Sequence, residues 1–331
     1  MKSFYLIAIP LLMLSCNDIQ PKEDLQKEVA TSSEIKFKKG SVVPFAPELF
    51  SQFTNVRDFT INPEETEAYF TVLSPARELS VIVSIQKENE QWAHPNIASF
   101  SGQYTDLEPF LSSDGLKLYF ASNRPVSKDS TNVKDFDIWY VQRNQRGSEW
   151  SEPINMGAPV NSPLDEFYPS VAKSNNIYFT MVKKELESQD DIFMCEWNNG
   201  AYSEPILLGE GVNTKGAEYN AFIAPDESYL LFGGWRRADG LGSGDLYMSK
   251  RIDGEWQEAT NLGTDINSEY MEYCPFVNTE TGTLYITSRK SHVEKKEDGY
   301  HDFDELMREL NRYDNGSSRI YKVDFSNNLP R

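Results

Sequence analysis

The stretch "DLEPFLSSDGLKLYFASNRP", from Asp106 to Pro125, decides the fold because its pattern returns along the chain. It begins with an acidic residue, reaches a Pro three residues later, alternates apolar residues with others, and turns at Ser-Asp-Gly. This pattern is typical of two short strands joined by a tight turn.

Four other stretches match it: "VRDFTINPEETEAYFT" from Val56, "DEFYPSVAKSNNIYFT" from Asp165, "AEYNAFIAPDESYLLFGG" from Ala217 and "MEYCPFVNTETGTLYITSR" from Met271. Aligned at their aromatic-rich ends, the five copies place Phe70, Phe120, Phe179, Phe232 and Ile286 at one position, with spacings of 50, 59, 53 and 54 residues. A period near 50 residues indicates a propeller or a solenoid.

Each copy continues with a strand that opens on an acid, as in "DIWYVQR", "DIFMCEW" and "DLYMSKR". An outer strand follows, as in "WSEPINMG", "YSEPILLG" and "WQEATNLG". Each unit therefore consists of four short strands, which is the composition of a propeller blade.

The ends of the chain explain the fifth unit, which has three strands and lacks the outer one. An unmatched outer-strand copy, "PFAPELFS", lies at Pro44–Ser51. We expect an all-β fold: a five-bladed β-propeller closed by this N-terminal outer strand, because closure removes exposed sheet edges. A sixth blade would need a repeat that the sequence does not contain.

The last blade carries a long insertion, "SHVEKKEDGYHDFDELMRELNRYDNGSS". Its apolar residues follow the i, i+3, i+4, i+7 spacing of an amphipathic helix. Asp302 is the expected N-cap. The predicted short helix should lie at the face of the acidic residues described below, with its apolar stripe packed on the blade. These apolar residues are Phe303, Leu306, Met307 and Leu310.

The acid-x-x-Pro start, "SSDGLKLYFASNRP", the "DIW" strand and "WSEPINMG" followed by "VNS" resemble the TolB-type, WD-like propeller repeat of bacterial envelope proteins. The resemblance covers about residues 44 to 326. It implies a propeller fold, and protein or peptide contacts in the envelope. The repeat occurs in many functional contexts, so function must be argued from the site.

The N-terminus, "MKSFYLIAIPLLMLSC", has Lys2, an apolar run to Leu14, and then Ser15-Cys16. The run is too short for a membrane-spanning helix and indicates a secretion signal. A small residue followed by Cys resembles the lipobox of bacterial lipoproteins, which implies cleavage before Cys16 and its lipidation. Plain secretion is the alternative. The predicted organisation is a signal peptide over 1–15, a flexible tether over 16–35 and the propeller over 36–331, anchored by lipid in the cell envelope on either face.

The composition narrows the class of partner. The formal net charge is −19, which repels phosphate backbones, so nucleic acid is not expected as a partner. The two remaining cysteines, Cys195 and Cys274, belong to different blades, and two buried thiols are expected rather than a disulfide. No Cys or His pair has zinc spacing.

Four blades open their inner strand with an acid, and these acids should lie near one mouth of the central channel. One interpretation is a ligand site for a cation, for calcium or for acid–base chemistry. The other is that each acid bonds to the backbone of a neighbouring blade. Calcium is considered but not predicted, and no metal or other cofactor is predicted. The four candidate residues are Asp106, Glu166, Glu218 and Glu272.

Basic residues also recur. Arg124 precedes Asp137 and Arg237 precedes Asp245, which predicts pairs across a loop. In the Gly-rich "FGGWRRADGLGSGD", Trp235 and Arg236 are candidate ligand residues, because an aromatic beside arginines suits an anionic sugar or a carboxylate.

No nucleophile elbow and no catalytic triad is recognisable, so no catalytic residue is predicted. We expect a non-catalytic lipoprotein that binds or scaffolds a protein, peptide or glycan at the channel mouth. Alternatively, the carboxylates could serve a carbohydrate-active enzyme, either a glycoside hydrolase or a lyase. A sugar-binding accessory protein for glycan uptake is a third interpretation.

Overall fold

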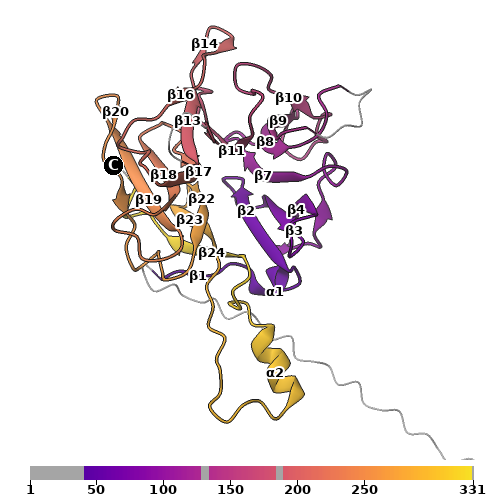
Figure 1. Cartoon of the computed structure of the whole chain (residues 1–331). Coiled ribbons are helices and arrows are strands. Elements are labelled where there is room, and N and C mark those ends of the chain that lie inside the picture. Colours follow the sequence, from indigo (N-terminus) through magenta and orange to yellow (C-terminus); the bar gives the residue numbers. More distant parts are fainter. Residues whose placement is uncertain (1–40, 128–133, 184–188, 330–331) are drawn as a thin grey trace, which may run out of the picture. The chain divides into compact units, whose positions relative to one another are not determined.

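The computed structural model describes residues 41–127, 134–183 and 189–329. Its strands form five blades around a channel, shown in Figure 1. The predicted five-bladed β-propeller is therefore confirmed. Cys16, the signal sequence and the tether lie outside the described residues. Within the described ranges, no helix is long and apolar enough to cross a bilayer.

Three long strands run outward from the channel in each blade. The inner strands are β2 (Asn55–Ile61), β7 (Asp106–Leu111), β11 (Glu166–Val171), β17 (Ala217–Ile223) and β22 (Glu272–Asn278). The second strands are β3 (Glu67–Leu73), β8 (Lys117–Ser122), β12 (Ile177–Met181), β18 (Tyr229–Trp235) and β23 (Thr283–Ser288). The third strands are β4 (Ser80–Glu88), β9 (Asp137–Gln142), β13 (Asp191–Cys195), β19 (Asp245–Ile252) and β24 (Arg319–Asp324).

The outer strands are short: β6 (Asn96–Ile97), β10 (Ile154–Asn155), β16 (Ile206–Leu207), β21 (Thr260–Asn261) and, in the last blade, β1 (Val43–Pro44). Three blades also carry small pairings beside the third strand, formed by β5 (Gln91–Trp92), by β14 (Trp197–Asn198) with β15 (Ala201–Tyr202), and by β20 (Glu255–Trp256).

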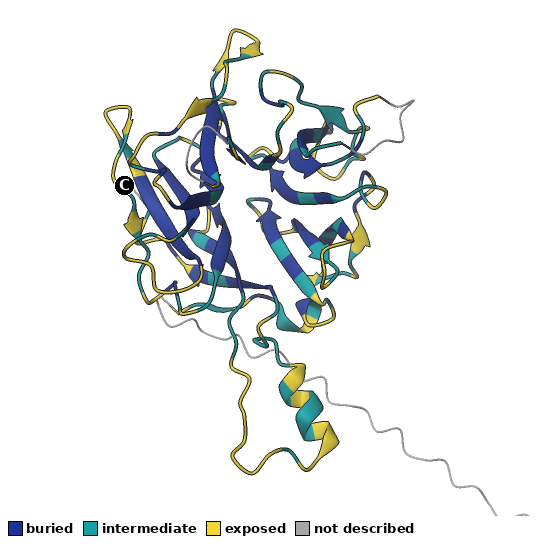
Figure 2. Cartoon of the chain, in the orientation of Figure 1, coloured by how far each residue is buried: buried dark blue, intermediate teal, exposed yellow. Residues whose placement is uncertain are grey.

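The position that the repeats share, Phe in four blades and Ile in the fifth, forms the centre of each blade. All five residues at this position lie on second strands and are at most 1% exposed, and Figure 2 shows the blades as mostly buried. Because apolar burial is the main favourable term in folding, the repeat seen in the sequence is also the repeat of the core. These residues are Phe70, Phe120, Phe179, Phe232 and Ile286.

The ring closes through the N-terminal segment. Val43 pairs with Lys322 and Pro44 with Tyr321, so β1 completes the last blade as predicted. The strand is shorter than the Pro44–Ser51 expected, because the chain turns after Pro44 into the one-turn helix α1 (Pro47–Phe50). Phe50 in this helix is fully buried, and its ring centroid lies 4.9 Å from that of Phe70 in the first blade. The segment therefore ties the last blade to the first.

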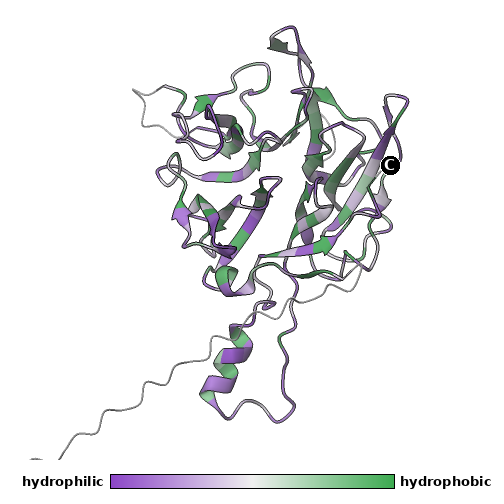
Figure 3. Cartoon of the chain, turned by 180° about the vertical axis from the view of Figure 1, so that it is seen from behind, coloured by the Kyte–Doolittle hydropathy of each residue, from purple (hydrophilic) through white to green (hydrophobic). Residues whose placement is uncertain are grey.

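The predicted helix in the insertion is confirmed as α2 (Phe303–Leu310), and the Asp302 carboxylate accepts a hydrogen bond from the Glu305 amide at 2.7 Å. The prediction that its apolar stripe packs on the blade is wrong. No residue of α2 is buried, and the exposed fractions of Phe303 and Leu310 are 72% and 48%. The insertion bonds mainly to itself, as between Glu309 and the Glu294 amide, and projects beyond β24 (Figure 1). Figure 3 shows hydrophilic and hydrophobic residues alternating along α2.

Both cysteines of the described propeller are buried free thiols, as predicted. Cys195 lies in the third blade and Cys274 in the fifth, on β13 and β22.

Candidate functional site

Each inner strand contains a β-bulge at the same place. The register of pairing with the second strand shifts at this point in all five blades. At each bulge one residue other than Gly has a positive φ, between 49° and 61°. Such a backbone costs of order 1–3 kcal/mol and persists only where its surroundings impose it. We call these five residues the channel ring: Asp58, Glu108, Tyr168, Asn220 and Cys274.

The bulge explains how consecutive residues reach the same cavity. In a regular strand, neighbouring side chains point to opposite faces, whereas a bulge redirects one of them. Leu107 and Glu108 therefore both line the pocket at the channel mouth, as do Tyr219 and Asn220. The pocket has a volume of about 640 Å³.

Below the channel ring, three aromatic rings meet across the channel. They belong to Phe110, Phe222 and Phe276, each two residues after a channel-ring residue, and their centroids lie 5.3 to 6.4 Å apart. Because these residues come from three different blades, their contact fills the channel beneath the pocket.

The channel ring is joined by one arginine. Arg57 donates from Nε to Asp58 at 2.6 Å and from Nη2 to Glu108 at 2.9 Å. The Cys274 thiol donates to Asp58 at 2.8 Å, and the Tyr168 amide donates to Glu108 at 2.7 Å. The second carboxylate oxygen of Asp58 is buried, and no described residue donates a hydrogen bond to it. Blades 1, 2, 3 and 5 are thus linked around the axis by polar contacts.

Burial controls the protonation of this network. It raises the pKa of Glu108 to about 8, with the neighbouring Asp58 adding to the shift and Arg57 opposing it. Burial also raises the pKa of the Cys274 thiol well above its ordinary value. A carboxyl that holds its proton near neutral pH can donate a hydrogen bond or a proton to a molecule in the pocket.

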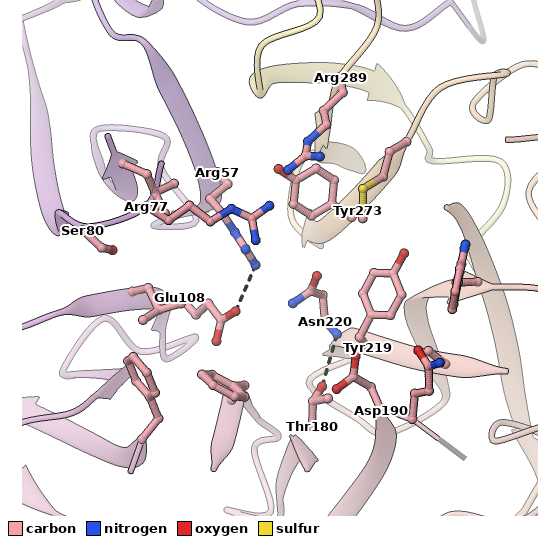
Figure 4. Close-up of a pocket in the computed structure, with 18 of the residues that line it drawn as sticks. Arg57, Arg77, Ser80, Glu108, Thr180, Asp190, Tyr219, Asn220, Tyr273 and Arg289 are labelled. Carbon is pink, nitrogen blue, oxygen red and sulfur yellow. Dashed lines mark hydrogen bonds and ion pairs between the residues drawn. The ribbon is translucent and has the colours of Figure 1, made fainter. Parts of the chain in front are cut away.

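The pocket walls combine aromatic and charged side chains, as Figure 4 shows. The guanidinium groups of Arg57, Arg77 and Arg289 gather at one side of the view. Tyr219 and Asp190 lie across from them, and burial raises the pKa of Asp190. The aromatic surface of the pocket is completed by Phe136, Phe167, Tyr273 and Trp235.

The four acids proposed from the sequence form a different ring, two residues earlier on the inner strands. We call it the framework ring. Its members are at most 2% exposed and none lines this pocket, although Glu272 borders a smaller cavity near β1. The members of this ring are Asp106, Glu166, Glu218 and Glu272.

Each framework acid has hydrogen-bond partners close by in the sequence. Ser162 donates to Glu166 from its hydroxyl at 2.5 Å, and the Thr214 hydroxyl donates to Glu218 at 2.7 Å. In the same way, the Ser268 hydroxyl donates to Glu272 at 2.7 Å. These contacts support the structural interpretation of the four acids. A ligand role for them stays a prediction.

The recurrent arginines belong to this framework too. The prediction that Arg124 pairs with Asp137 is wrong, because Arg124 pairs with Asp106 at 2.6 Å, while Asp137 pairs with Lys134 at 2.7 Å. Arg237 lies 3.6 Å from Glu218 rather than pairing with Asp245. In both blades, the arginine that follows the second strand therefore pairs with the acid of the inner strand in the same blade.

The other two residues proposed for ligand binding lie together. The guanidinium of Arg236 stacks on the ring of Trp235, 4.0 Å from its centroid. Trp235 lines the pocket, whereas Arg236 is exposed and does not line it. Among the described residues, no group of three or more His, Cys, Asp or Glu side chains could hold a metal ion.

Sequence reasoning missed the channel ring. A signal was present, since the third residue of the acid-x-x-Pro motif is the place where the repeat changes chemistry from blade to blade. Arg77 lies in the turn between β3 and β4 and follows no repeated motif, so pattern alone did not mark it.

Comparison with known proteins agrees with the fold. No protein family matches the chain, and no curated protein matches its sequence. A solved structure described as a BT0996 RGII complex is 8% identical to this protein. Its TM-score is 0.52, over 84% of this protein and 92% of the matched one.

Two other similar structures have named activities or assignments. A protein assigned as TolB from Agrobacterium tumefaciens is 12% identical, with a TM-score of 0.45 over 70% of this protein and 69% of its own length. An alpha-L-arabinofuranosidase from Lactobacillus brevis is also 12% identical, with a TM-score of 0.46 over 84% and 92%. Structural neighbours thus include TolB-like propellers and glycoside hydrolases. The similarity with a TM-score of 0.52 at 8% identity shows the fold alone.

Proposed function

We propose that this protein is a lipid-anchored binding module of the bacterial cell envelope, which holds a peptide, protein or glycan ligand in the pocket at the channel mouth. The anchor is Cys16, and the tether of residues 16–35 gives the propeller reach from the membrane surface. The TolB-like repeat and the signal sequence support the envelope location.

The observation that carries the binding function is the contrast in chemistry along the inner strands. The framework ring has an acid in four blades and does not line the pocket, whereas the channel ring has five different side chains, of which Glu108 and Asn220 line the open pocket. A position that serves only the blade architecture can carry the same side chain in every blade. A position that contacts an asymmetric ligand is expected to carry different side chains in different blades.

Filling the pocket tests the proposal. Ser243 is exposed at the pocket wall, so Ser243→Trp should block the mouth without disturbing a buried contact. The matched control is Ala201→Trp, on the exposed tip of the β14–β15 pairing. The full-length protein in detergent would be applied to arrays of oligosaccharides and peptides.

We expect one ligand class to bind the wild type and Ala201→Trp and to lose at least tenfold in affinity with Ser243→Trp. Binding that survives equally in both variants would place the ligand elsewhere. Absence of binding to every probe would reject the binding function.

The second candidate function is a carbohydrate-active enzyme, and the raised pKa of Glu108 specifically favours it. A protonated carboxyl beside an open pocket is a suitable general acid, and Asp190 is a second carboxyl in the same pocket. The wild type would be incubated with neutral and acidic polysaccharides and assayed for new reducing ends. Product that disappears in Glu108→Gln but persists in Glu152→Gln, an exposed control, would replace binding with catalysis.

A further inference from the structure

We infer, on the basis of the proposed function, that the ligand of the channel-mouth pocket is an acidic saccharide whose carboxylate is held by Arg77 and Arg289. Arg77 follows no repeated motif, Arg289 comes directly after the second strand of the last blade, and both line the pocket.

The arginines of the pocket differ in how far they are neutralised. Arg57 forms ion pairs with Asp58 and Glu108. Among the described residues, Arg77 and Arg289 form no ion pair. Within the described part of the chain, the Arg289 guanidinium donates one long hydrogen bond, of 3.4 Å to the Ser318 hydroxyl, and lies over the Tyr273 ring at 5.8 Å. Two guanidinium groups therefore face the pocket with most of their donors available.

The position of Arg77 is imposed by the backbone. It is an exposed residue with a φ of 65°, in a turn in which its amide donates to the Ser74 carbonyl at 3.0 Å. This turn joins β3 to β4 in blade 1, whereas Arg289 follows β23 in blade 5. Blades 1 and 5 are neighbours where the propeller ring closes, and each thus contributes one cation to the same pocket.

The charge of the pocket is opposite to that of the whole protein. Three arginines, Arg57, Arg77 and Arg289, line it against two carboxyls, Glu108 and Asp190. The whole protein has a net charge of −19. A cationic cavity in an acidic protein attracts an anion locally, and guanidinium groups match carboxylates in geometry.

The remaining walls favour a sugar over an acidic peptide. Glu108 and Asp190 can accept hydrogen bonds from hydroxyl groups, and the aromatic residues Tyr219, Tyr273 and Trp235 offer faces for the C–H surface of a pyranose ring. Because three phenylalanines fill the channel below, the pocket is closed at its base, which suits a short saccharide segment.

Titration calorimetry with a matched pair of ligands tests the inference. Trigalacturonic acid carries carboxylates where galactotriose carries hydroxymethyl groups, and triglutamate supplies carboxylates without a sugar. The variants are Arg77→Gln and Arg289→Gln, with Arg308→Gln on the exposed face of α2 as the control that removes the same charge. All are measured with the full-length protein at two salt concentrations.

We expect trigalacturonic acid to bind at least tenfold more tightly than galactotriose. Each pocket variant should lose about tenfold or more, since a charge-assisted hydrogen bond is lost, and Arg308→Gln should match the wild type. Equal binding of both trisaccharides, unaffected by the pocket variants, would overturn the inference and leave the binding function standing. Binding of triglutamate alone would replace the saccharide with an acidic peptide. If no probe binds and the array experiment is also empty, the binding function itself fails.

Discussion

The framework ring and the channel ring lie two residues apart on the same inner strands, yet they obey different rules. Framework acids bond to a Ser or Thr four residues earlier in three blades, as Glu166 does to Ser162. Channel-ring residues bond across blades, as in the contacts of Arg57 with Glu108 and of Cys274 with Asp58. A side chain that repeats in each blade makes a local contact that stabilises that blade. A side chain that differs from blade to blade makes contacts that occur once in the protein, between blades at the channel axis.

The largest expected effect is at the framework ring. Asp106→Ala removes a fully buried carboxylate that pairs with Arg124 and accepts from Ser122 at 2.6 Å. Leaving the buried arginine without its partner should cost about 3–5 kcal/mol of unfolding free energy. Urea unfolding followed by circular dichroism measures this loss. A change below about 1 kcal/mol, the range of ordinary surface ion pairs, would mean that the acid is not a structural element.

The next effect concerns Glu108 and pH. The pKa of this carboxyl is raised in the folded protein, so between its unfolded value and about 8 the folded state binds the extra proton. Stability should therefore fall as pH rises through this window, by up to about 1.4 kcal/mol per pH unit for one group. Glu108→Gln replaces the titrating carboxyl with a neutral amide and should therefore flatten the dependence of the unfolding free energy on pH.

The framework acid Glu166 gives a second prediction about pH, which can be compared with that for the channel-ring acid Glu108. Burial raises its pKa to about 7, so Glu166→Gln should also remove part of the slope. Because this acid accepts from both the hydroxyl and the amide of Ser162, Glu166→Gln should in addition destabilise the fold at every pH. Unfolding curves measured from pH 4 to 9 separate the two variants. Equal, pH-independent losses in both would contradict the distinction between the rings.

A smaller effect is expected for the thiols. Burial raises the pKa of Cys274 well above its ordinary value and that of Cys195 to about 12, so neither is a thiolate at pH 8. The thiolate is the reactive form, and both propeller thiols should therefore resist iodoacetamide in the native protein and react in urea. Mass spectrometry of the alkylated peptides reads this directly. Rapid native labelling of Cys274 would show that the channel ring is open to solvent.

The smallest effect on stability is expected at the pocket wall. Arg77 is exposed and unpaired among the described residues, so Arg77→Gln should change the unfolding free energy by no more than about 0.5 kcal/mol. The same urea titration measures it. A loss of unfolding free energy as large as that of Asp106→Ala would show that Arg77 has a structural role rather than a role in ligand binding.

Much of the fold could be read from the sequence because blades are built from local patterns. The aromatic position of the second strand, the turn before it and the acid of the inner strand all recur at a period of about 50 residues. The closing strand was also predictable, since one outer-strand copy was missing at one end and present at the other. The length of this strand was not predictable, because the strand is followed by α1, whose Phe50 packs against Phe70 of the first blade, far away in the sequence from the last blade that the strand completes.

The insertion shows the limit of local patterns. Helical spacing and the Asp302 cap predicted α2 correctly, since both act within a few residues. Where the apolar stripe would lie depended on contacts with distant parts of the protein, and the helix remains exposed.

The sequence by itself determined the blades, their number and the framework ring, because the contacts that make them recur every blade and span short stretches of chain. Only the tertiary structure decided the pocket. Arg57 meets Glu108, 51 residues away, and Cys274, 217 residues away, because closure of the ring brings the inner strands together at one axis. The residues that make these contacts differ from blade to blade, so no sequence repeat marks them. The bulge that directs their side chains toward the channel is visible only in the backbone.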